Sequence, residues 1–207
     1  MKLYYAPGTC SLAPHIALTM AELNFDLIKV DLSTKLTETD ENYTKINPKG
    51  YVPTLVLDDG TILTEGVAVL QYIADQAPEK NLAPSPTSMD RYRLQEKLNF
   101  ITSEIHKGFA PLFNDKTPEA YRTIALERLK GRYTLLNSYL EKDDYLLNNT
   151  FSVADAYLYN VSRWSKFHNF DLAAYPYVAA FMERVNNLPA VQKALKNEGT
   201  PSYSAAA

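Results

Sequence analysis

Residues 47–55 read NPKGYVPTL, which places two prolines and a glycine directly ahead of a short apolar run. A proline cannot donate a hydrogen bond to a neighbouring strand, so Pro53 at a strand start would leave the backbone around Val52 open to an extended ligand. If the bond between these two residues is cis, the chain also turns sharply there. Local propensity alone favours a plainer interpretation, an ordinary Pro-Gly turn ahead of a hairpin.

A β-hairpin and a helix are predicted directly after this segment. Two short apolar runs, Pro53–Leu57 and Thr61–Leu63, flank Asp58-Asp59-Gly60, and Asp-Gly is among the strongest local signals for a hairpin turn. The apolar residues of Glu65–Ala77 then recur at the spacing of an amphipathic helix. The order predicted here is therefore β-β-α.

The residues ahead of the segment predict a first β-α-β unit. Lys2–Tyr5 is a short apolar stretch that ends near a Pro-Gly pair, and apolar residues recur at helical spacing from 12 to 23. Phe25–Leu32 alternates as a second strand does, and the polar stretch Ser33–Asn47 predicts a loop with one short helix. The order predicted for residues 1–77 is β-α-β-α-β-β-α.

The two halves of the chain differ in their patterns. Residues 78–86 hold three prolines among polar and charged neighbours, which predicts a linker. The rest of the chain carries helical patterns, including capping boxes at Thr87–Asp90 and Ser152–Asp155. We therefore expect an α/β domain over residues 1–77 and an all-helical domain over residues 87–207.

Composition narrows the classes of function. The formal net charge of -3 over 207 residues argues against nucleic acid as the main partner. No apolar run approaches the roughly 20 residues of a membrane span, and the N-terminus lacks a secretory signal, so we expect a cytoplasmic protein without a membrane partner. One cysteine cannot form a CxxC redox pair or a Cys-based zinc cluster, and three scattered histidines do not suggest a metal site.

Cys10 stands between the first predicted strand and the first predicted helix. A thiol at a helix N-terminus experiences the positive end of the helix dipole and nearby free N–H groups, and both stabilise a thiolate. Free cysteines are also often buried and inert. Position alone gives the two interpretations about even weight.

A polar face is predicted on the helix that begins near Thr87. Asn99, Ser103 and His106 fall at i, i+4 and i+7, so a regular helix presents an amide, a hydroxyl and an imidazole together. Imidazole can orient a thiol or stabilise a thiolate. Taken alone, the pattern is more typical of a solvated helix face.

Glu65 and Gly66 stand where the third helix should begin. Free N–H groups at a helix N-terminus attract an anion, and a glycine lets that anion approach the backbone closely. The neighbouring carboxylate could pair with a ligand amine. The alternative is a simple first-turn acid, which is common.

Together these features resemble the cytosolic glutathione transferases, and the match to the bacterial beta class is close. The resemblance extends over nearly the whole chain. The segments that carry it, in chain order, are Ala6–Ser11, Asn47–Pro53, Leu63–Ala68 and Ser152–Asp155. The last is similar to the family's buried folding motif.

The resemblance implies a thioredoxin-like first domain, a helical second domain, and a homodimer with each active site near the subunit boundary. It also implies glutathione as co-substrate without a metal, with Cys10 and His106 at the glutathione sulfur. The backbone of Val52, ahead of a cis proline, would pair with the cysteinyl part of glutathione. Glu65 would face its γ-glutamyl amine, and the N–H of Gly66 its carboxylate.

The resemblance implies further glutathione-binding positions. Lys35 lies where the class places a lysine for the glycyl carboxylate. Many relatives place Ser after the acid, so Gly66 would forfeit that hydroxyl contact. The other implied positions are Tyr51, Pro53, Asn99, Ser103, Glu104 and Lys107.

Three activities remain open at this point. The first is conjugation of glutathione to small hydrophobic electrophiles. The second is reduction of disulfides or hydroperoxides through a Cys10–glutathione adduct, which a second glutathione must resolve because the chain has no second cysteine. The third is non-catalytic binding of bulky hydrophobic compounds. The residues expected to line a hydrophobic groove are Phe109, Phe113, Trp164 and His168.

Overall fold

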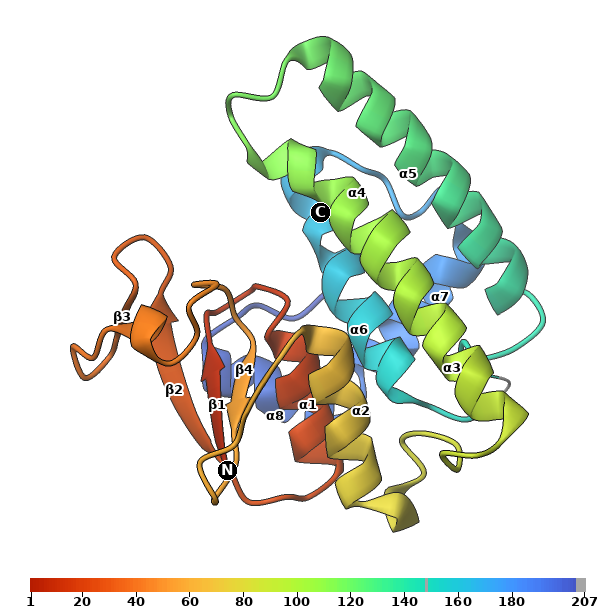
Figure 1. Cartoon of the computed structure of the whole chain (residues 1–207). Helices are drawn as coiled ribbons and strands as arrows, with labels where there is room; N and C mark the ends of the chain where they lie inside the picture. The colour runs from red at the N-terminus through yellow and green to blue at the C-terminus, as the bar shows by residue number, and fades with distance from the viewer. Residues whose placement is uncertain (148, 204–207) are drawn as a thin grey trace. The chain divides into compact units, whose positions relative to one another are not determined.

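The computed structural model describes residues 1–147 and 149–203. The chain divides into two compact units, which are Met1–Ala83 with Leu188–Ser202, and Pro84–Asn187 with Tyr203. The first holds all the strands that Figure 1 labels, and the second is helical. Within the described residues, no helix combines the length and the apolar character needed to cross a membrane.

The first unit is built on a five-stranded mixed sheet of order β3-β2-β1-β4-β5. Its strands are β1 (Lys2–Tyr5), β2 (Asp26–Asp31), β3 (Leu36–Thr37), β4 (Thr54–Val56) and β5 (Ile62–Thr64). Strands β1 and β2 run parallel, with Leu3 opposite Leu27. Strand β4 runs antiparallel to both β1 and β5, which confirms the predicted hairpin.

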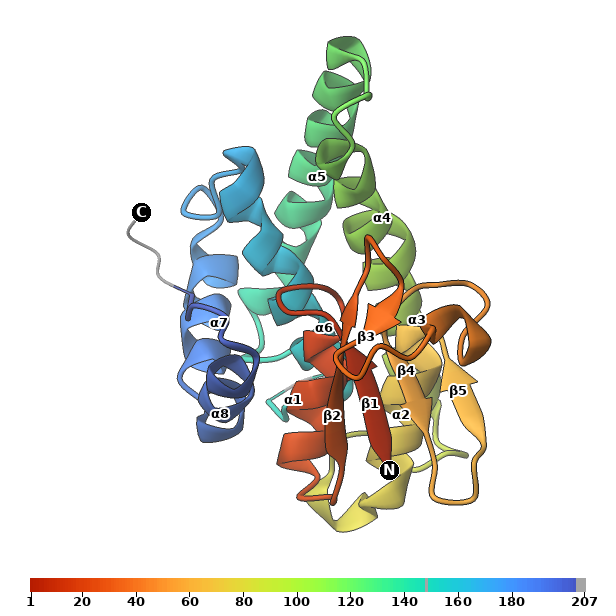
Figure 2. The same cartoon turned by 90° about the vertical axis from the view of Figure 1, so that its left-hand side faces the viewer.

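Helices α1 (Leu12–Met20) and α2 (Gly66–Gln76) lie on one face of this sheet (Figures 1 and 2). Side chains alternate across a strand, so neighbouring residues of β1 serve opposite faces. Leu3 is fully buried, and Tyr4 joins a separate apolar cluster that includes Tyr43 and Val52. The segment predicted as a loop with a short helix forms β3 and a single 3₁₀ turn, Tyr43–Lys45.

The division of the chain differs from the expected one at its C-terminal end. We expect residues 87–207 to form one helical domain, but α8 (Pro189–Glu198) belongs to the first unit and packs against α1. The apolar stripe of α8 is buried there. A stripe of this kind predicts that a helix face is covered but not which element covers it, so the sequence did not assign α8 to its unit. The first boundary, after Ala83, falls inside the linker predicted over residues 78–86.

The second unit contains the remaining helices. They are α3 (Met89–Phe100), a π-helical turn (Ile101–His106), α4 (Lys107–Phe109), a 3₁₀ turn (Ala110–Phe113), α5 (Glu119–Leu140), α6 (Val153–Ser162), a 3₁₀ turn (Arg163–His168) and α7 (Pro176–Asn186). Helix α6 is buried along its whole length, and α3 and α7 pack against it.

Of the two predicted capping boxes, the second is confirmed and the first is wrong. Ser152 donates to the Asp155 carboxylate from its N–H and from its hydroxyl, each at 2.8 Å. Helix α3 begins one residue later than the Thr87 box requires, because Ser88 is the cap and accepts from the Arg91 N–H at 3.1 Å. With the helix starting there, Arg91 is buried, and its Nε donates to the carbonyl oxygen of Pro84 at 2.8 Å.

Candidate functional site

Cys10 lies in the turn between β1 and α1, next to the N-cap residue Ser11. The thiol is half-buried, and its Sγ donates to the carbonyl oxygen of Val52 at 3.2 Å. Two segments that the sequence singled out separately, the cysteine turn and residues 47–53, therefore meet in the structure. The bond between Val52 and Pro53 is cis, as the resemblance implies.

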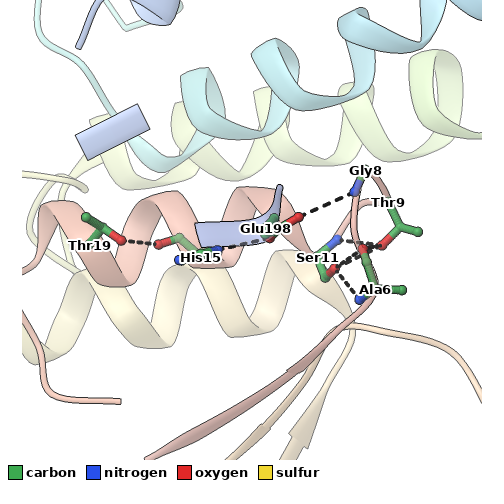
Figure 3. Close-up of polar contacts among 7 residues, drawn as sticks. All are labelled: Ala6, Gly8, Thr9, Ser11, His15, Thr19 and Glu198. Carbon is green, nitrogen blue, oxygen red and sulfur yellow. Dashed lines mark hydrogen bonds and ion pairs between the residues drawn. The ribbon is translucent and has the colours of Figure 1, made fainter. Parts of the chain in front are cut away.

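The turn that presents Cys10 is held by side-chain hydroxyls (Figure 3). The Ser11 hydroxyl accepts from the Ala6 N–H at 3.1 Å, and the Thr9 hydroxyl donates to the Ala6 carbonyl at 2.8 Å. Such short side-chain bonds to the backbone fix a turn that has no ladder of its own. The position of Cys10 is therefore set locally before any ligand is present.

A buried contact between a carboxylate and an imidazole supports the same turn from α8 (Figure 3). Glu198 accepts from the Gly8 N–H at 3.4 Å and lies 3.0 Å from Nδ1 of His15 on α1. Both side chains of the pair are fully buried. Sequence reasoning missed Glu198, because an acid near a chain end normally indicates an exposed position. The signal that could have found it is its place on the apolar stripe of α8.

Glu65 caps α2 with a backbone φ of 68°, a left-handed conformation that costs a non-glycine residue free energy. Its carboxylate lies 2.6 Å from Nζ of Lys49, and the two side chains are 71% and 52% exposed. An exposed ion pair contributes little to stability, so a ligand ammonium group can replace the lysine. Gly66 opens α2, and a Cβ added there would lie 3.8 Å from Pro53, an ordinary contact. A serine would therefore fit at this position.

Lys35 reaches the same segment from the turn between β2 and β3. Its Nζ donates to the carbonyl of Gly50 at 2.9 Å and lies 5.9 Å from the ring centroid of Tyr51. That tyrosine ring is 71% exposed. The structure thus places Lys35 beside Gly50 and Tyr51, Cys10 beside Val52, and Pro53 beside Gly66.

The second unit carries the remaining predicted positions, but not on a regular helix. Helix α3 ends at Phe100, and the π-helical turn that follows has a wider hydrogen-bond spacing than an α-helix. The regular α-helix predicted through Asn99, Ser103 and His106 is therefore interrupted by a π-helical turn. The Ser103 hydroxyl donates to the Asn99 carbonyl at 3.0 Å. A bulge of this kind has no signature in the apolar pattern of the sequence.

His106 is half-buried among aromatic rings. Its Nδ1 lies 2.6 Å from the hydroxyl of Tyr157, and the ring of Trp164 meets it edge-on with centroids 4.9 Å apart. Burial, and next the positive charge of Lys107, lower the pKa of His106 from 6.5 to about 4. The imidazole is therefore neutral at pH 7, with one N–H and one acceptor nitrogen. The contact between Tyr157 and His106 was not predicted, because it depends on how α6 packs.

The predicted hydrophobic-groove residues form one aromatic cluster. The ring of Phe113 lies 5.4 Å from Trp164 and 4.4 Å from His168, and Phe109 stacks on His168 at 6.0 Å. Phe109 is fully buried, and Phe113 is 51% exposed. Phe113 is thus the most exposed member of the cluster and can meet a ligand, whereas Phe109 belongs to the core.

The last three predicted positions line a pocket of about 360 Å³ in the second unit. They are Ser103, Glu104 and Lys107. The carboxylate of Glu104 accepts from Nε of Arg132 at 2.6 Å. Across the residues that the structure covers, no group of three or more His, Cys, Asp or Glu side chains could hold a metal ion.

A strand, a cysteine turn, a helix and a cis proline ahead of an antiparallel hairpin define a thioredoxin-like domain, here followed by a helical unit. Residues 8–76 match the model for the glutathione S-transferase N-terminal domain, and residues 100–189 match the model for the C-terminal domain. The predicted fold class is confirmed by these matches.

Named relatives agree with the family models. The chain is 45% identical to glutathione S-transferase GstA of Escherichia coli O157:H7, over 96% of this chain and 99% of that protein. A sphingomonad glutathione S-transferase complexed with glutathione superposes with a TM-score of 0.94 at 46% identity, covering 97% of this chain and 100% of the other. The beta-class enzyme of Sphingomonas chungbukensis superposes equally well, at 42% identity over the same shares.

The chain belongs to the glutathione S-transferase family. It is a glutathione transferase, and glutathione is its substrate. The resemblance to this family and the predicted enzyme class are confirmed, and the similar solved structures include a beta-class enzyme.

Proposed function

We propose that this enzyme conjugates glutathione to small hydrophobic electrophiles, with Cys10 and His106 at the glutathione sulfur. One observation carries the proposal. The Cys10 thiol lies 3.2 Å from the carbonyl of Val52, the residue whose backbone would pair with the cysteinyl part of glutathione. A peptide held along Val52 would bring its own sulfur beside Cys10.

The first unit supplies the groups that would hold the tripeptide. Glu65 would exchange its lysine partner for the γ-glutamyl ammonium group, because that ion pair is exposed. The first N–H groups of α2, beginning at Gly66, would bind the γ-glutamyl carboxylate. Lys35 would supply charge for the glycyl carboxylate, with Tyr51 and Pro53 shaping the surface beside it.

His106 would act at the sulfur as a neutral hydrogen-bond donor. Conjugation needs the glutathione thiolate, and a donor aimed at the sulfur stabilises the developing negative charge. The lowered pKa of His106 supports this role, since a neutral imidazole keeps its donor without competing for the thiol proton. The same bound glutathione would also be contacted by Asn99, Ser103, Glu104 and Lys107. The enzyme would act as a homodimer in the cytoplasm.

The chemical step balances without a cofactor. The glutathione thiol loses its proton to solvent, and the thiolate attacks the electrophilic carbon and forms a carbon–sulfur bond. With an aryl halide, the halide ion leaves with the bonding pair. Cys10 stays a thiol, because a second thiolate beside the first would oppose its ionisation, and its one proton turns from the Val52 carbonyl to the glutathione sulfur.

A second candidate activity follows from the partial exposure of Cys10. Its thiolate could attack the glutathionyl sulfur of a mixed disulfide and release the other thiol. A second glutathione would then reduce the adduct and leave as glutathione disulfide, which restores Cys10. This cycle uses only glutathione and needs no resolving cysteine.

Steady-state assays separate the two activities. We expect turnover of an aryl halide in the wild type, and retention of part of it in Cys10→Ala, because other donors still face the sulfur. Disulfide exchange with hydroxyethyl disulfide should vanish in that variant. A wild type that turns over cumene hydroperoxide and hydroxyethyl disulfide but no aryl halide would establish the second activity instead. Absence of glutathione binding by calorimetry would refute both.

A further inference from the structure

A buried polar cluster lies directly behind the turn that carries Val52. Its members are Tyr43, Asn47 and Thr54, and none of them is exposed by more than 2%. The phenol oxygen of Tyr43 lies 2.7 Å from the carbonyl oxygen of Tyr51, and Nδ2 of Asn47 lies 2.8 Å from the same oxygen. One main-chain carbonyl therefore accepts from two buried side chains.

Counting protons fixes the direction of each bond in this cluster. Tyr43 has one hydroxyl proton, which goes to the carbonyl, so the Thr54 hydroxyl 2.6 Å away must donate to the phenol oxygen. Asn47 has two amide protons, and its second bond goes to the Thr54 oxygen at 3.0 Å. Its own side-chain oxygen accepts from the N–H of Lys49 at 3.1 Å. The cluster has no spare donor, so the Tyr51 carbonyl has one stable direction.

The direction of that carbonyl sets the direction of the next N–H. A peptide unit is planar, and in its trans form the carbonyl and the N–H point opposite ways. The one cis bond found among the described residues follows Val52, so the unit between Tyr51 and Val52 is trans. With the Tyr51 oxygen directed into the cluster, the Val52 N–H points away from it.

The Val52 N–H has no acceptor among residues 1–147 and 149–203. Val52 is nevertheless buried to 6% exposure. A backbone N–H without a protein acceptor needs water or a ligand as its partner. A ligand carbonyl that arrives at this edge would supply the missing acceptor.

We propose that Tyr43 and Asn47 are positioning residues for glutathione, which hold the Tyr51 carbonyl so that the Val52 N–H meets the cysteinyl carbonyl of the tripeptide. This inference rests on the proposed function, because the ligand is glutathione. Neither residue touches the ligand. Each acts through the orientation of one peptide unit, so its loss weakens ligand binding rather than the chemical step.

The chain offers a closely matched control. Tyr4 is a second buried tyrosine of the same apolar cluster, with its ring centroid 5.6 Å from that of Tyr43. Within the described parts of the chain, its hydroxyl bonds to no other residue. Tyr43→Phe and Tyr4→Phe therefore each remove one phenol oxygen from the same apolar cluster. Only the oxygen of Tyr43 is hydrogen-bonded to the Tyr51 carbonyl.

Calorimetry with glutathione tests the proposal. We expect Tyr43→Phe to raise the dissociation constant about fivefold, the typical effect of one hydrogen bond, while Tyr4→Phe leaves it unchanged. In turnover assays, KM for glutathione should rise with kcat unaltered. Should Tyr43→Phe fail to fold, Asn47→Ala carries the same expectation. Equal dissociation constants for Tyr43→Phe and Tyr4→Phe would overturn the proposal.

A ligand analogue distinguishes positioning from a general structural defect. In this analogue a methylene replaces the cysteinyl carbonyl, so it cannot accept from Val52. It should bind the wild type more weakly than glutathione does, and Tyr43→Phe should weaken it no further. An equal penalty on both ligands would show a merely structural role and refute the inference. Failure of the wild type to bind glutathione would instead refute the proposed function.

Discussion

The two units hold their candidate site residues by different means. In the first unit, the groups assigned to glutathione include main-chain groups at turns, which are the Val52 backbone and the N–H of Gly66. In the second unit, the assigned groups are side chains whose places depend on packing, such as His106 against Tyr157 and Trp164. Main-chain geometry follows from local turn chemistry, whereas side-chain geometry follows from long-range contacts. Variants should therefore act differently in the two units.

The largest effect is expected in the second unit, at Asp155. This carboxylate accepts from the N–H of Leu146 and from both donors of Ser152, all at 2.8 Å. Asp155→Ala leaves these three buried donors without an acceptor and should lower the free energy of unfolding by about 3 kcal/mol. Urea denaturation followed by fluorescence of the single tryptophan, Trp164, measures this unit. The exposed Asp115→Ala is the control, and a loss under about 1 kcal/mol would contradict the packing argument.

The next effect is a pH dependence from His106. Its pKa is lowered to about 4 in the folded chain, so the unfolded chain binds more protons between pH 4 and 6.5. Stability is therefore lost as the pH falls through this window, by about 3 kcal/mol in total. His106→Asn should remove that slope in urea denaturation at a series of pH values.

Asp155 contributes to the same window with the opposite sign. Burial raises its pKa to about 6, so its contribution is present at low pH and lost as the pH rises through 6. Comparing His106→Asn with the wild type cancels this shared contribution. If the free energy of unfolding falls equally with falling pH in the two proteins, His106 is not desolvated in solution.

A smaller effect is expected in the first unit, at Glu198. Glu198→Gln keeps the shape of the side chain but weakens its bonds to His15 and to the Gly8 N–H, at a cost of about 2 kcal/mol. The turn that carries Cys10 should loosen, and alkylation of this single cysteine should speed up. Glu79→Gln, an exposed acid of the same unit, should change neither quantity. Unchanged alkylation in Glu198→Gln would show that α8 does not hold the turn.

The smallest effect concerns the aromatic cluster. Phe113 is its half-exposed member, so Phe113→Ala should raise KM for a hydrophobic electrophile about fivefold without changing the affinity for glutathione. Phe167, which is 71% exposed and makes no ring contact among the described residues, provides the control. An equal rise in Phe167→Ala would indicate a loss of general surface hydrophobicity rather than a substrate contact.

The comparison of the units also explains what could be predicted. The hairpin, the Ser152–Asp155 cap and the overall fold class follow from turn and helix chemistry within a few residues, and the structure confirms them. The start of α3 and the π-helical turn before His106 do not, because each depends on which side chains are buried. The place of α8 depends on a partner at the opposite end of the chain.

The candidate site shows the same limit. The sequence by itself determined that a cysteine turn, a Pro-Gly segment and an acid at a helix start occur in the order typical of one family, because these motifs use local backbone chemistry. Only the tertiary structure decided that Cys10 contacts Val52 and that Glu198 supports the cysteine turn. It also decided that Tyr43 and Asn47 donate hydrogen bonds to the Tyr51 carbonyl. The first two contacts join residues far apart in the sequence, and the third is a buried network whose bonds are strengthened by the exclusion of water.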